Sequence, residues 1–307
     1  MKKQFKVFSI LLIIVMCLNC SAVSLASNSS ENSIIEEKHK KAISVLTNAG
    51  WEENDIYDML SEEEILTYAD VESVVTSEKK YYKVSDTQTT EISENQCHYE
   101  INKIKKDFIA NLTPQNSGIS VCGMVIGDTV KDETKTTDGY FTYYVQAYRK
   151  GSVTFILSAR YEWLISPKNR KIDVFGLGHD TNLTKNISSS DVHYVYKADI
   201  TNLADGTTYT YQTTNADEMK VGIGGVVIKQ KLNSDPTAVN HRGYLRYDAV
   251  KNNSAATAFE IFAEYYHQQT TIQVSPVIGF PSGGSISVSP SESFKFMSPN
   301  PHVGGTF

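Results

Sequence analysis

The stretch Ser152-Val-Thr-Phe-Ile-Leu-Ser-Ala-Arg-Tyr-Glu-Trp163 alternates between apolar and polar side chains almost without a break. One set of alternate positions carries the side chains of Val153, Phe155, Leu157, Ala159, Tyr161 and Trp163. The other set is polar except for Ile156. A period of two residues over this length is typical of a strand with one buried face. We therefore predict a β-strand here, with Trp163 in the core.

The segment before this strand has the alternation of a pairing partner. Its inner set is Phe141, Tyr143, Val145 and Ala147, and Arg149-Lys150-Gly151 has the composition of a hairpin turn. Further predicted strands cover residues 119–126, 171–177, 192–200, 207–213, 220–231, 243–250, 257–266, 269–278 and 284–289. A single helical pattern, Lys103 to Leu112, interrupts them. The fold class is therefore mainly β, and residues 77–307 should form an antiparallel β-sandwich or a barrel-like body.

Residues 27–76 have the pattern of a small three-helix region. The first helix should stop near Gly50, because glycine tolerates the left-handed conformation that ends helices. Ser61 and Glu64 have the spacing of a capping box at the start of the third helix. The three helices would surround Trp51, and the region would pack on the body or dock a partner.

The amino terminus has the three parts of a secretory signal peptide. Lys2 and Lys3 precede an apolar run over residues 7–18, and Ser24-Leu25-Ala26 supplies small residues at a cleavage site. The run is shorter than the roughly 20 residues of a membrane-spanning helix. Residues 1–26 are therefore predicted to be a signal peptide cleaved after Ala26, or alternatively after Ala22. The protein would be secreted, extracellular or associated with the cell surface.

Two other interpretations of this amino terminus remain open. The apolar run could stay uncleaved as a membrane anchor. Alternatively, Cys17 or Cys20 could carry the acyl group of a lipoprotein, although Met16 and Asn19 before them are larger than the usual glycine or alanine. With the signal removed, no later segment is apolar enough to cross a membrane as a helix.

Signal cleavage would leave two cysteines, Cys97 and Cys122, in an oxidising compartment. A disulfide between them would close a loop of about 25 residues and contribute roughly 3–4 kcal/mol in the chain-entropy model. The alternative is a pair of free buried thiols. Neither cysteine lies in a CxxC pair, so a metal site is not predicted.

The sequence offers no catalytic constellation and no cofactor motif. Neither a GxSxG elbow nor an HExxH pair is present, and the formal net charge of −6 argues against nucleic-acid binding. His179-Asp180 could act as a general base or metal ligand, and Asn240-His241-Arg242 is another polar turn, but plain loops explain both. Glu260 and Glu264 would lie about 13 Å apart along a strand, beyond the usual range for glycoside cleavage.

Several short stretches resemble uncharacterised secreted proteins of Gram-positive bacteria. Those stretches are Arg160-Tyr161-Glu162-Trp163-Leu164 with Pro167, Arg170, Asp173-Val174 and Gly176, then Asn48-Ala49-Gly50-Trp51, and Lys79-Lys80-Tyr81-Tyr82-Lys83-Val84. The resemblance covers most of the mature chain in layout but only these stretches in residues. It implies secretion and a short helical region followed by a β-rich body, and no activity.

Tyrosines supply the sequence's main hint of a binding surface. Tyr140, Tyr144 and Tyr148 fall on the face opposite the predicted core. An exposed row of tyrosines would contact an extracellular protein or a carbohydrate. The alternative is a sheet covered on both sides, in which these rings belong to a second core.

Three functions remain open on this basis. The first is a secreted non-enzymatic binding or interaction protein. The second is a β-pore-forming or membrane-active protein, because Thr207–Thr214 and Ser285–Ser289 alternate like amphipathic hairpins. The third is a secreted hydrolase with an unrecognised site.

Overall fold

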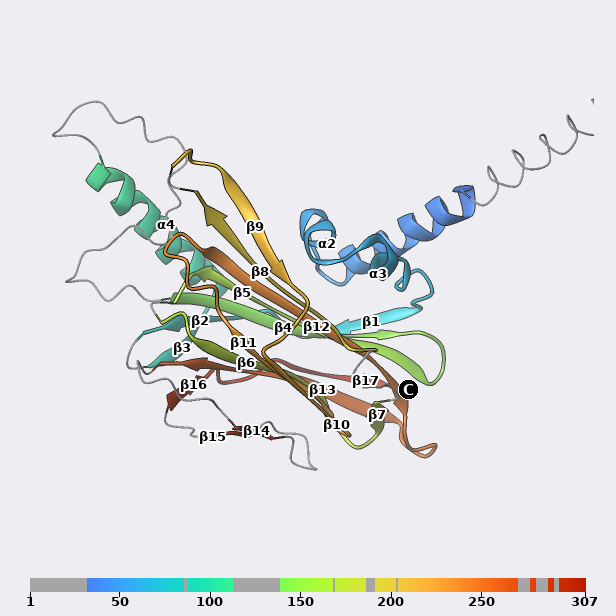
Figure 1. Cartoon of the computed structure of the whole chain (residues 1–307). Coiled ribbons are helices and arrows are strands. Elements are labelled where there is room, and N and C mark those ends of the chain that lie inside the picture. Colours follow the sequence, from blue (N-terminus) through green and yellow to red (C-terminus); the bar gives the residue numbers. More distant parts are fainter. Residues whose placement is uncertain are drawn as a thin grey trace, which may run out of the picture. The chain divides into compact units, whose positions relative to one another are not determined.

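The computed structural model describes residues 32–85, 88–112, 139–167, 169–185, 191–202, 204–269, 277–279, 287–289 and 293–307 (Figure 1). The chain divides into two compact units, Met1–Val71 and Glu72–Phe307. The predicted signal peptide, Cys122 and the predicted strand at 119–126 lie outside the described residues.

The first unit contains helices joined by short turns in its described part. A helix runs through residues 32–48, followed by α2 (Glu53–Met59) and α3 (Glu62–Leu66). The chain turns at Gly50, whose φ of 90° lies in the left-handed region where glycine is favoured. The predicted capping box is confirmed, because the Ser61 side chain accepts from the Glu64 N–H and the Glu64 side chain accepts from the Ser61 N–H.

The second unit contains two antiparallel sheets. The larger sheet has the strand order β3-β2-β4-β5-β12-β8-β9, with β1 and β7 pairing at its margins. Its strands are β1 (Ser73–Thr76), β2 (Lys80–Val84), β3 (Thr89–Ile92), β4 (Gly139–Arg149), β5 (Thr154–Ile165), β7 (Leu183–Lys185), β8 (His193–Thr201), β9 (Thr208–Thr213) and β12 (Val239–Lys251). The predicted pairing of β4 with β5 is confirmed, and Tyr143 lies opposite Tyr161.

The smaller sheet has the order β10-β11-β6-β13-β16, with β17 also pairing with β13. Its strands are β6 (Ile172–His179), β10 (Glu218–Gly222), β11 (Gly225–Lys231), β13 (Ala258–Gln268), β16 (Phe294–Phe296) and β17 (His302–Thr306). A separate two-stranded ribbon joins β14 (Val277–Gly279) to β15 (Ser287–Ser289).

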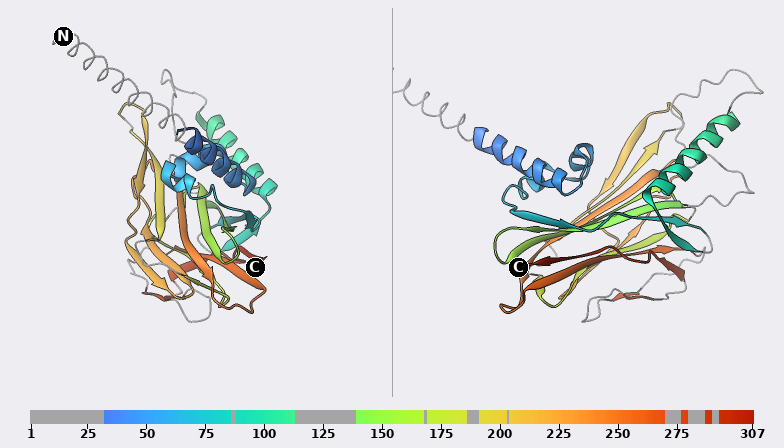
Figure 2. Two further views of the ribbon diagram at one scale, coloured as in Figure 1. Left: turned by 90° about the vertical axis from the view of Figure 1, so that its right-hand side faces the viewer. Right: turned by 180° about the vertical axis from the view of Figure 1, so that it is seen from behind.

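One hydrophobic core lies between the two sheets. The buried face of β5 (Phe155, Leu157, Tyr161 and Trp163) shares it with the inner faces of β4, β6, β8, β11, β12 and β13. Figure 2 shows the two sheets as separate layers. The predicted antiparallel sandwich is therefore confirmed, and of the two architectures that the sequence allowed, the sandwich is the one observed.

Aromatic rings fill the centre of this core. Phe141 lies 5.0 Å from Trp163 and 4.3 Å from Tyr265 between ring centroids, while Tyr161 lies 4.8 Å from Tyr265. Gly243 on β12 leaves room for the Tyr161 ring, because a Cβ at Gly243 would lie 2.3 Å from a carbon of that ring. Rings from both sheets thus interlock at spacings typical of aromatic pairs.

Three predictions about the elements are wrong in detail. Residues 73–76, assigned to the helical region, form β1 and pair with β4. The predicted single strand at 220–231 is a hairpin, because Gly222 pairs with Gly225 and Ile223 is 83% exposed at the turn. The predicted helix from Lys103 begins earlier, since α4 spans Glu94–Leu112.

Replacing Trp163 tests this core directly. The ring is fully buried and its Nε1–H donates to the Tyr265 hydroxyl at 2.9 Å, so Trp163→Ala removes both packing and a hydrogen bond. We expect a loss of about 3–5 kcal/mol in the free energy of unfolding, measured by chemical denaturation. Tyr209→Ala, at a side chain 55% exposed, should cost less than about 0.5 kcal/mol. A loss below about 1 kcal/mol for Trp163→Ala would contradict the core assignment.

Candidate functional site

The tyrosine row on β4 is not an exposed surface. Tyr140, Tyr144 and Tyr148 are 2%, 4% and 0% exposed. They do lie on the face of β4 opposite the core, as the alternation indicates, but this face is covered. The expectation of an exposed contact surface at these residues is therefore not met, and their role as ligand-binding residues stays an untested prediction.

Part of the cover comes from α4. Tyr140 forms a small hydrophobic cluster with Tyr81, Ile165 and, from α4, Cys97 and Ile101. The Tyr140 hydroxyl donates to Glu100 Oε2 at 2.6 Å, and Lys83 Nζ lies 2.9 Å from the same oxygen. These donors lower the pKa of Glu100 to about 2, with the Tyr140 hydrogen bond as the largest cause.

The remaining two rings have their own polar contacts. Lys79 Nζ lies 5.3 Å from the centroid of the Tyr144 ring, within the range of a cation–π contact. The Tyr148 hydroxyl donates to Gln146 Oε1 at 2.7 Å. The three tyrosines thus belong to a packed second layer, which the sequence left open as the alternative.

Cys97 on α4 is buried and has no disulfide partner among the described residues. Burial raises its pKa to about 12, and the carboxylates of Glu100 and Glu94 add to the shift. A thiol with so high a pKa is a poor nucleophile, because the thiolate is the reactive form. Cys122 lies outside the described residues, so the predicted bridge to Cys97 stays a prediction.

A buried polar cluster connects the two sheets next to Trp163. Tyr265 donates its hydroxyl to Asp173 Oδ2, and His267 Nδ1 lies 2.7 Å from Asp173 Oδ1. Trp163 Nε1 lies 3.4 Å from Asp173 Oδ2. All four side chains are less than 2% exposed. A His–Asp pair this deeply buried satisfies polar atoms of the core and is out of reach of a ligand.

The sequence analysis did not find this cluster. Asp173 and His267 are 94 residues apart, and no sequence motif links the two. Only the pairing of β6 with β13, which places Asp173 opposite His267, brings them together. A signal was present nonetheless, since Asp173 interrupts an apolar strand at a position that faces the core.

The other sequence candidates do not form a catalytic pair. His179 is buried, and its Nδ1 lies 2.8 Å from the backbone oxygen of Asp180 and not from its carboxylate. The Asp180 carboxylate instead accepts from the N–H groups of Asn182 and Glu260. Glu264 is buried and accepts from the Tyr266 hydroxyl at 3.1 Å, whereas Glu260 is exposed.

His241 is a buried histidine in β12, beside Tyr196. The Tyr196 hydroxyl accepts from the Asn233 N–H at 2.7 Å, and its oxygen also lies 2.7 Å from His241 Nδ1. The ring is neutral at pH 7, because burial disfavours its charged form. Burial, followed by the charge of Arg170, lowers the pKa of His241 to about 3.

A pocket of about 480 Å³ opens beside β2 and β3 and is lined by Glu78, Glu91, Glu94, Lys80 and Tyr81 among others. Lys80 Nζ lies 2.8 Å from Glu91 Oε1. The Tyr81 hydroxyl donates to Glu94 at 2.6 Å and is the main cause of a lowered pKa of that carboxyl. General acids in glycoside cleavage need a raised pKa, so this carboxylate is unsuited to that role.

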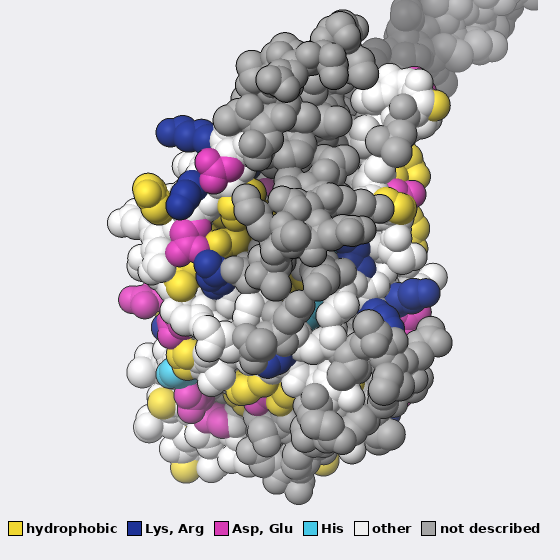
Figure 3. Space-filling model, turned by 90° about the vertical axis from the view of Figure 1, so that its left-hand side faces the viewer, with side chains coloured by type: hydrophobic (Ala, Val, Ile, Leu, Met, Phe, Trp, Pro, Cys, Tyr) yellow, Lys and Arg dark blue, Asp and Glu magenta, His cyan; other side chains and the backbone are white. Residues whose placement is uncertain are grey.

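Metal ligands and surface charge give no further candidate site among the described residues or on the face drawn in Figure 3. Within the described residues, no group of three or more His, Cys, Asp and Glu side chains could hold a metal ion. Basic and acidic side chains are interspersed on the face drawn in Figure 3. Of the helices in those same residues, none is long and apolar enough to cross a membrane.

The most exposed aromatic side chains of the β-rich unit's strands lie on β9. Tyr209 is 55% exposed and Tyr211 is 40% exposed. Both lie on the core-facing side of the sheet, because they pair with Ile200 and Ala198 of β8. Tyr211 contacts only the rim of the core, with its ring centroid 6.2 Å from that of Tyr196. The smaller sheet therefore does not cover β9.

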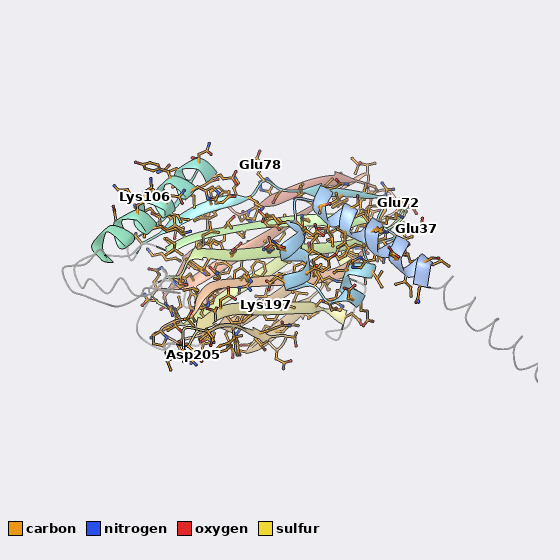
Figure 4. The ribbon with its side chains drawn as sticks, turned by 90° about the horizontal axis from the view of Figure 1, so that it is seen from above. Glu37, Glu72, Glu78, Lys106, Lys197 and Asp205 are labelled. Carbon is orange, nitrogen blue, oxygen red and sulfur yellow. The ribbon has the colours of Figure 1, made fainter. Side chains whose placement is uncertain are left out.

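Strand β9 also ends the larger sheet. Among the described strands it pairs only with β8, and residues 208–212 are all exposed. The hairpin that precedes β9 turns at Asp205-Gly206, as predicted, and Gly206 has a φ of 71°. Figure 4 shows Asp205 at this turn and Lys197 on β8.

The backbone of β9 presents alternate residues to the open edge. The Asn202 N–H donates to the Thr207 oxygen at 2.8 Å, so Thr207 directs its backbone groups toward β8. Successive residues of an antiparallel strand direct their N–H and C=O groups alternately toward and away from the partner strand. Tyr209 and Tyr211 therefore also direct their backbone groups toward β8. Thr208, Thr210 and Gln212 then direct their N–H and C=O groups away from β8. Thr201 of β8 lies opposite Thr208 and donates its N–H to the Thr237 side chain, not to β9. This contact agrees with backbone groups of Thr208 that point away from β8.

Comparisons with known proteins give no family and no function. No protein-family model matches the chain, and no curated protein matches it. A pilus backbone protein of Streptococcus pneumoniae is similar over 67% of this chain and 59% of that chain, with 10% identity and a TM-score of 0.28. The chain thus spans less than two thirds of that pilus protein.

Two further solved structures are similar at the same low level. A structure described as a pore forming protein has 7% identity and a TM-score of 0.26 over 55% of this chain and 86% of that one. A structure of manganese lipoxygenase of Gaeumannomyces graminis with part of a zonadhesin of Komagataella pastoris has 7% identity and a TM-score of 0.24, over 55% and 64%. None of these likenesses carries an argument about this chain, and the resemblance to uncharacterised secreted proteins stays a prediction.

Substituting His241 tests its buried neutral state. An unfolded chain protonates this histidine below about pH 6.5, whereas the folded chain resists protonation down to about pH 3. Folding stability is therefore lost as the pH falls through this window, by about 2 kcal/mol between pH 6.5 and pH 5. His241→Asn keeps an acceptor for the Tyr196 hydroxyl and removes the titration.

The measurement is the free energy of unfolding in urea at several pH values for both proteins. The variant should lose about 2 kcal/mol less than the parent between pH 6.5 and pH 5. Parallel pH curves for the two proteins would show that His241 is not held neutral by the fold.

Proposed function

We propose that this protein is a non-enzymatic interaction protein that binds an extended segment of another polypeptide along β9. The observation that carries the proposal is the open edge of β9, where Thr208, Thr210 and Gln212 direct backbone groups outward. Strand addition at such an edge is a common mode of peptide recognition, with main-chain hydrogen bonds supplying affinity. Tyr209 and Tyr211 add two exposed aromatic side chains to the same strand.

The edge favours a polypeptide over a carbohydrate. Its outward N–H and C=O groups repeat at every second residue, about 6.8 Å apart along the strand. This spacing matches the backbone of an antiparallel partner strand. A sugar would instead need a concave surface with convergent polar groups, and β9 is an exposed strand.

The polar groups of the body support a binding role over catalysis. The His267–Asp173 pair lies in the core, next to Trp163. A second pair, His98 and Glu94, is exposed, with His98 Nε2 3.7 Å from Glu94 Oε1. Glu94, at the rim of the pocket beside β2, is held ionised by Tyr81. We therefore rank the unrecognised hydrolase last among the three functions.

We further propose that the protein acts outside the cell or at its surface. The support is the amino-terminal sequence, in which Lys2 and Lys3 precede an apolar run and a cleavage site after Ala26. An extracellular location would give β9 access to partners on other cells or in the surrounding medium.

Membrane insertion is the competing proposal for the same segment. Thr207–Thr214 does alternate, with tyrosines on one face and Thr208, Thr210 and Gln212 on the other. However, β9 has 6 residues, against the 9–11 or so that a strand needs to cross a bilayer. Leakage of dye from phospholipid vesicles at micromolar protein would favour insertion over strand addition.

A proline substitution separates the edge from the fold. The Thr210 N–H points away from β8, so Thr210→Pro removes an outward donor without breaking the β8–β9 ladder. The probe is a fluorescein-labelled, end-capped decapeptide of alternating threonine and tyrosine. We expect its fluorescence anisotropy to rise on addition of the parent protein or Thr210→Val, and the affinity to fall at least tenfold for Thr210→Pro.

The control is the thermal unfolding of the three proteins, which should agree within a few degrees. Equal binding of the peptide by Thr210→Pro and by the parent, or no binding to either, would overturn the proposed function.

A further inference from the structure

We infer that the polypeptide added to β9 is β9 of a second copy of this chain, in an antiparallel pair centred on Thr210. This inference rests on the proposed function and names its partner. It follows from three features of the described structure, which are the parity of the outward backbone groups, the order of the side chains, and the absence of charge.

The alternating direction of the backbone groups limits the registers that two β9 strands can adopt. Only Thr208, Thr210 and Gln212 direct backbone groups to the open edge, so a hydrogen-bonded pair must join two of these residues. The register that pairs the most residues places Thr210 opposite Thr210 of the second copy. Thr208 then lies opposite Gln212 of the second copy, and the twofold axis passes beside Thr210, as in the isologous contact of a symmetric dimer.

The side chains fit this register. Residues 208–212 read Thr-Tyr-Thr-Tyr-Gln, which is palindromic about Thr210 apart from the Thr208 and Gln212 pair. Tyr209 therefore lies opposite Tyr211 of the second copy, and Tyr211 lies opposite Tyr209. Both are non-hydrogen-bonded positions, where the two strands bring side chains closest. Cross-strand aromatic pairs of this kind stabilise antiparallel sheets.

Two features that keep a sheet edge from pairing, charge and proline, are absent from this strand. Residues 206–215 contain no charged side chain and no proline. Natural proteins usually protect an open edge with lysine, proline, a bulge or a covering segment. In the proposed register the nearest charge, Asp205, lies opposite Asn215 of the second copy, so no like charges oppose each other. A partner chain of strong charge would gain nothing from this edge.

The side-chain hydrogen bonds between β9 and β8 stay intact when a second copy pairs with β9. Thr208 and Thr210 are hydrogen-bonded on the outer face of the sheet, to Thr201 Oγ1 at 3.2 Å and to Asp199 Oδ1 at 2.9 Å. These bonds run toward β8, on the side away from the second copy. Self-pairing therefore requires no rearrangement of the described β8–β9 hairpin, and a contact of one strand should be reversible and concentration-dependent.

Single cysteine substitutions on β9 test the register. In the proposed pair the two Thr210 Cα atoms lie about 5.5 Å apart, which suits a disulfide. The two Thr208 Cα atoms, offset by four residues, lie about 13 Å or more apart, beyond the range of a disulfide. Thr210→Cys should therefore form a covalent dimer under mild oxidation, at least tenfold faster than Thr208→Cys or Gln212→Cys.

The double variant Thr208→Cys with Gln212→Cys adds an independent check. Residues 208 and 212 are too far apart to bridge within one strand, yet each faces the other across the twofold axis. This variant should also dimerise, as read by non-reducing electrophoresis. The unsubstituted protein gives the background from its own cysteines, and thermal unfolding under reducing conditions confirms that each variant folds.

The outcomes separate this inference from the proposed function. Equal cross-linking by the three single variants, or none above background at millimolar protein, would overturn self-pairing. If the threonine–tyrosine decapeptide still binds the parent and not Thr210→Pro, strand addition stands and only the second copy is excluded as the partner. Cross-linking specific to Thr210→Cys and the double variant supports the inference.

Discussion

The body of this protein depends on an aromatic layer that two sheets bury from opposite sides. Trp163 and Phe141 from the larger sheet meet Tyr265 from the smaller one, and these rings supply much of the apolar area that leaves water on folding. Tyrosine and tryptophan also carry polar atoms that must find partners when buried. Asp173 meets that need by accepting from both the Tyr265 hydroxyl and Trp163 Nε1.

The same constraint explains why the polar groups of the core are not a reaction site. Asp173 and His267 satisfy each other inside the sandwich, and His241 remains neutral because burial disfavours its charged form. All three residues are at most 1% exposed and so are closed to a substrate. Catalysis would need a group that can change its protonation in contact with a substrate.

The strand proposed to bind a partner, β9, lies where the smaller sheet no longer covers the larger one. β9 extends the larger sheet beyond the cover of the smaller one, so Tyr209 and Tyr211 have a core-facing orientation without a core above them. Its outer backbone groups have no partner among the described strands, because β9 is the last strand of the larger sheet. An uncharged, aromatic strand with an unpaired edge has the properties expected of one side of a strand–strand interface.

The sequence by itself determined the class of fold, the pairing of β4 with β5, the core position of Trp163 and the capping box at Ser61. These follow from local periodicity and local hydrogen bonding, which neighbouring residues fix. It placed Tyr140, Tyr144 and Tyr148 on the correct face of β4, but periodicity cannot say whether another element covers that face, and α4 covers part of it. Only the tertiary structure brought Asp173 to His267 and left β9 at an open edge, because strand order joins residues far apart in the chain and has no local signature.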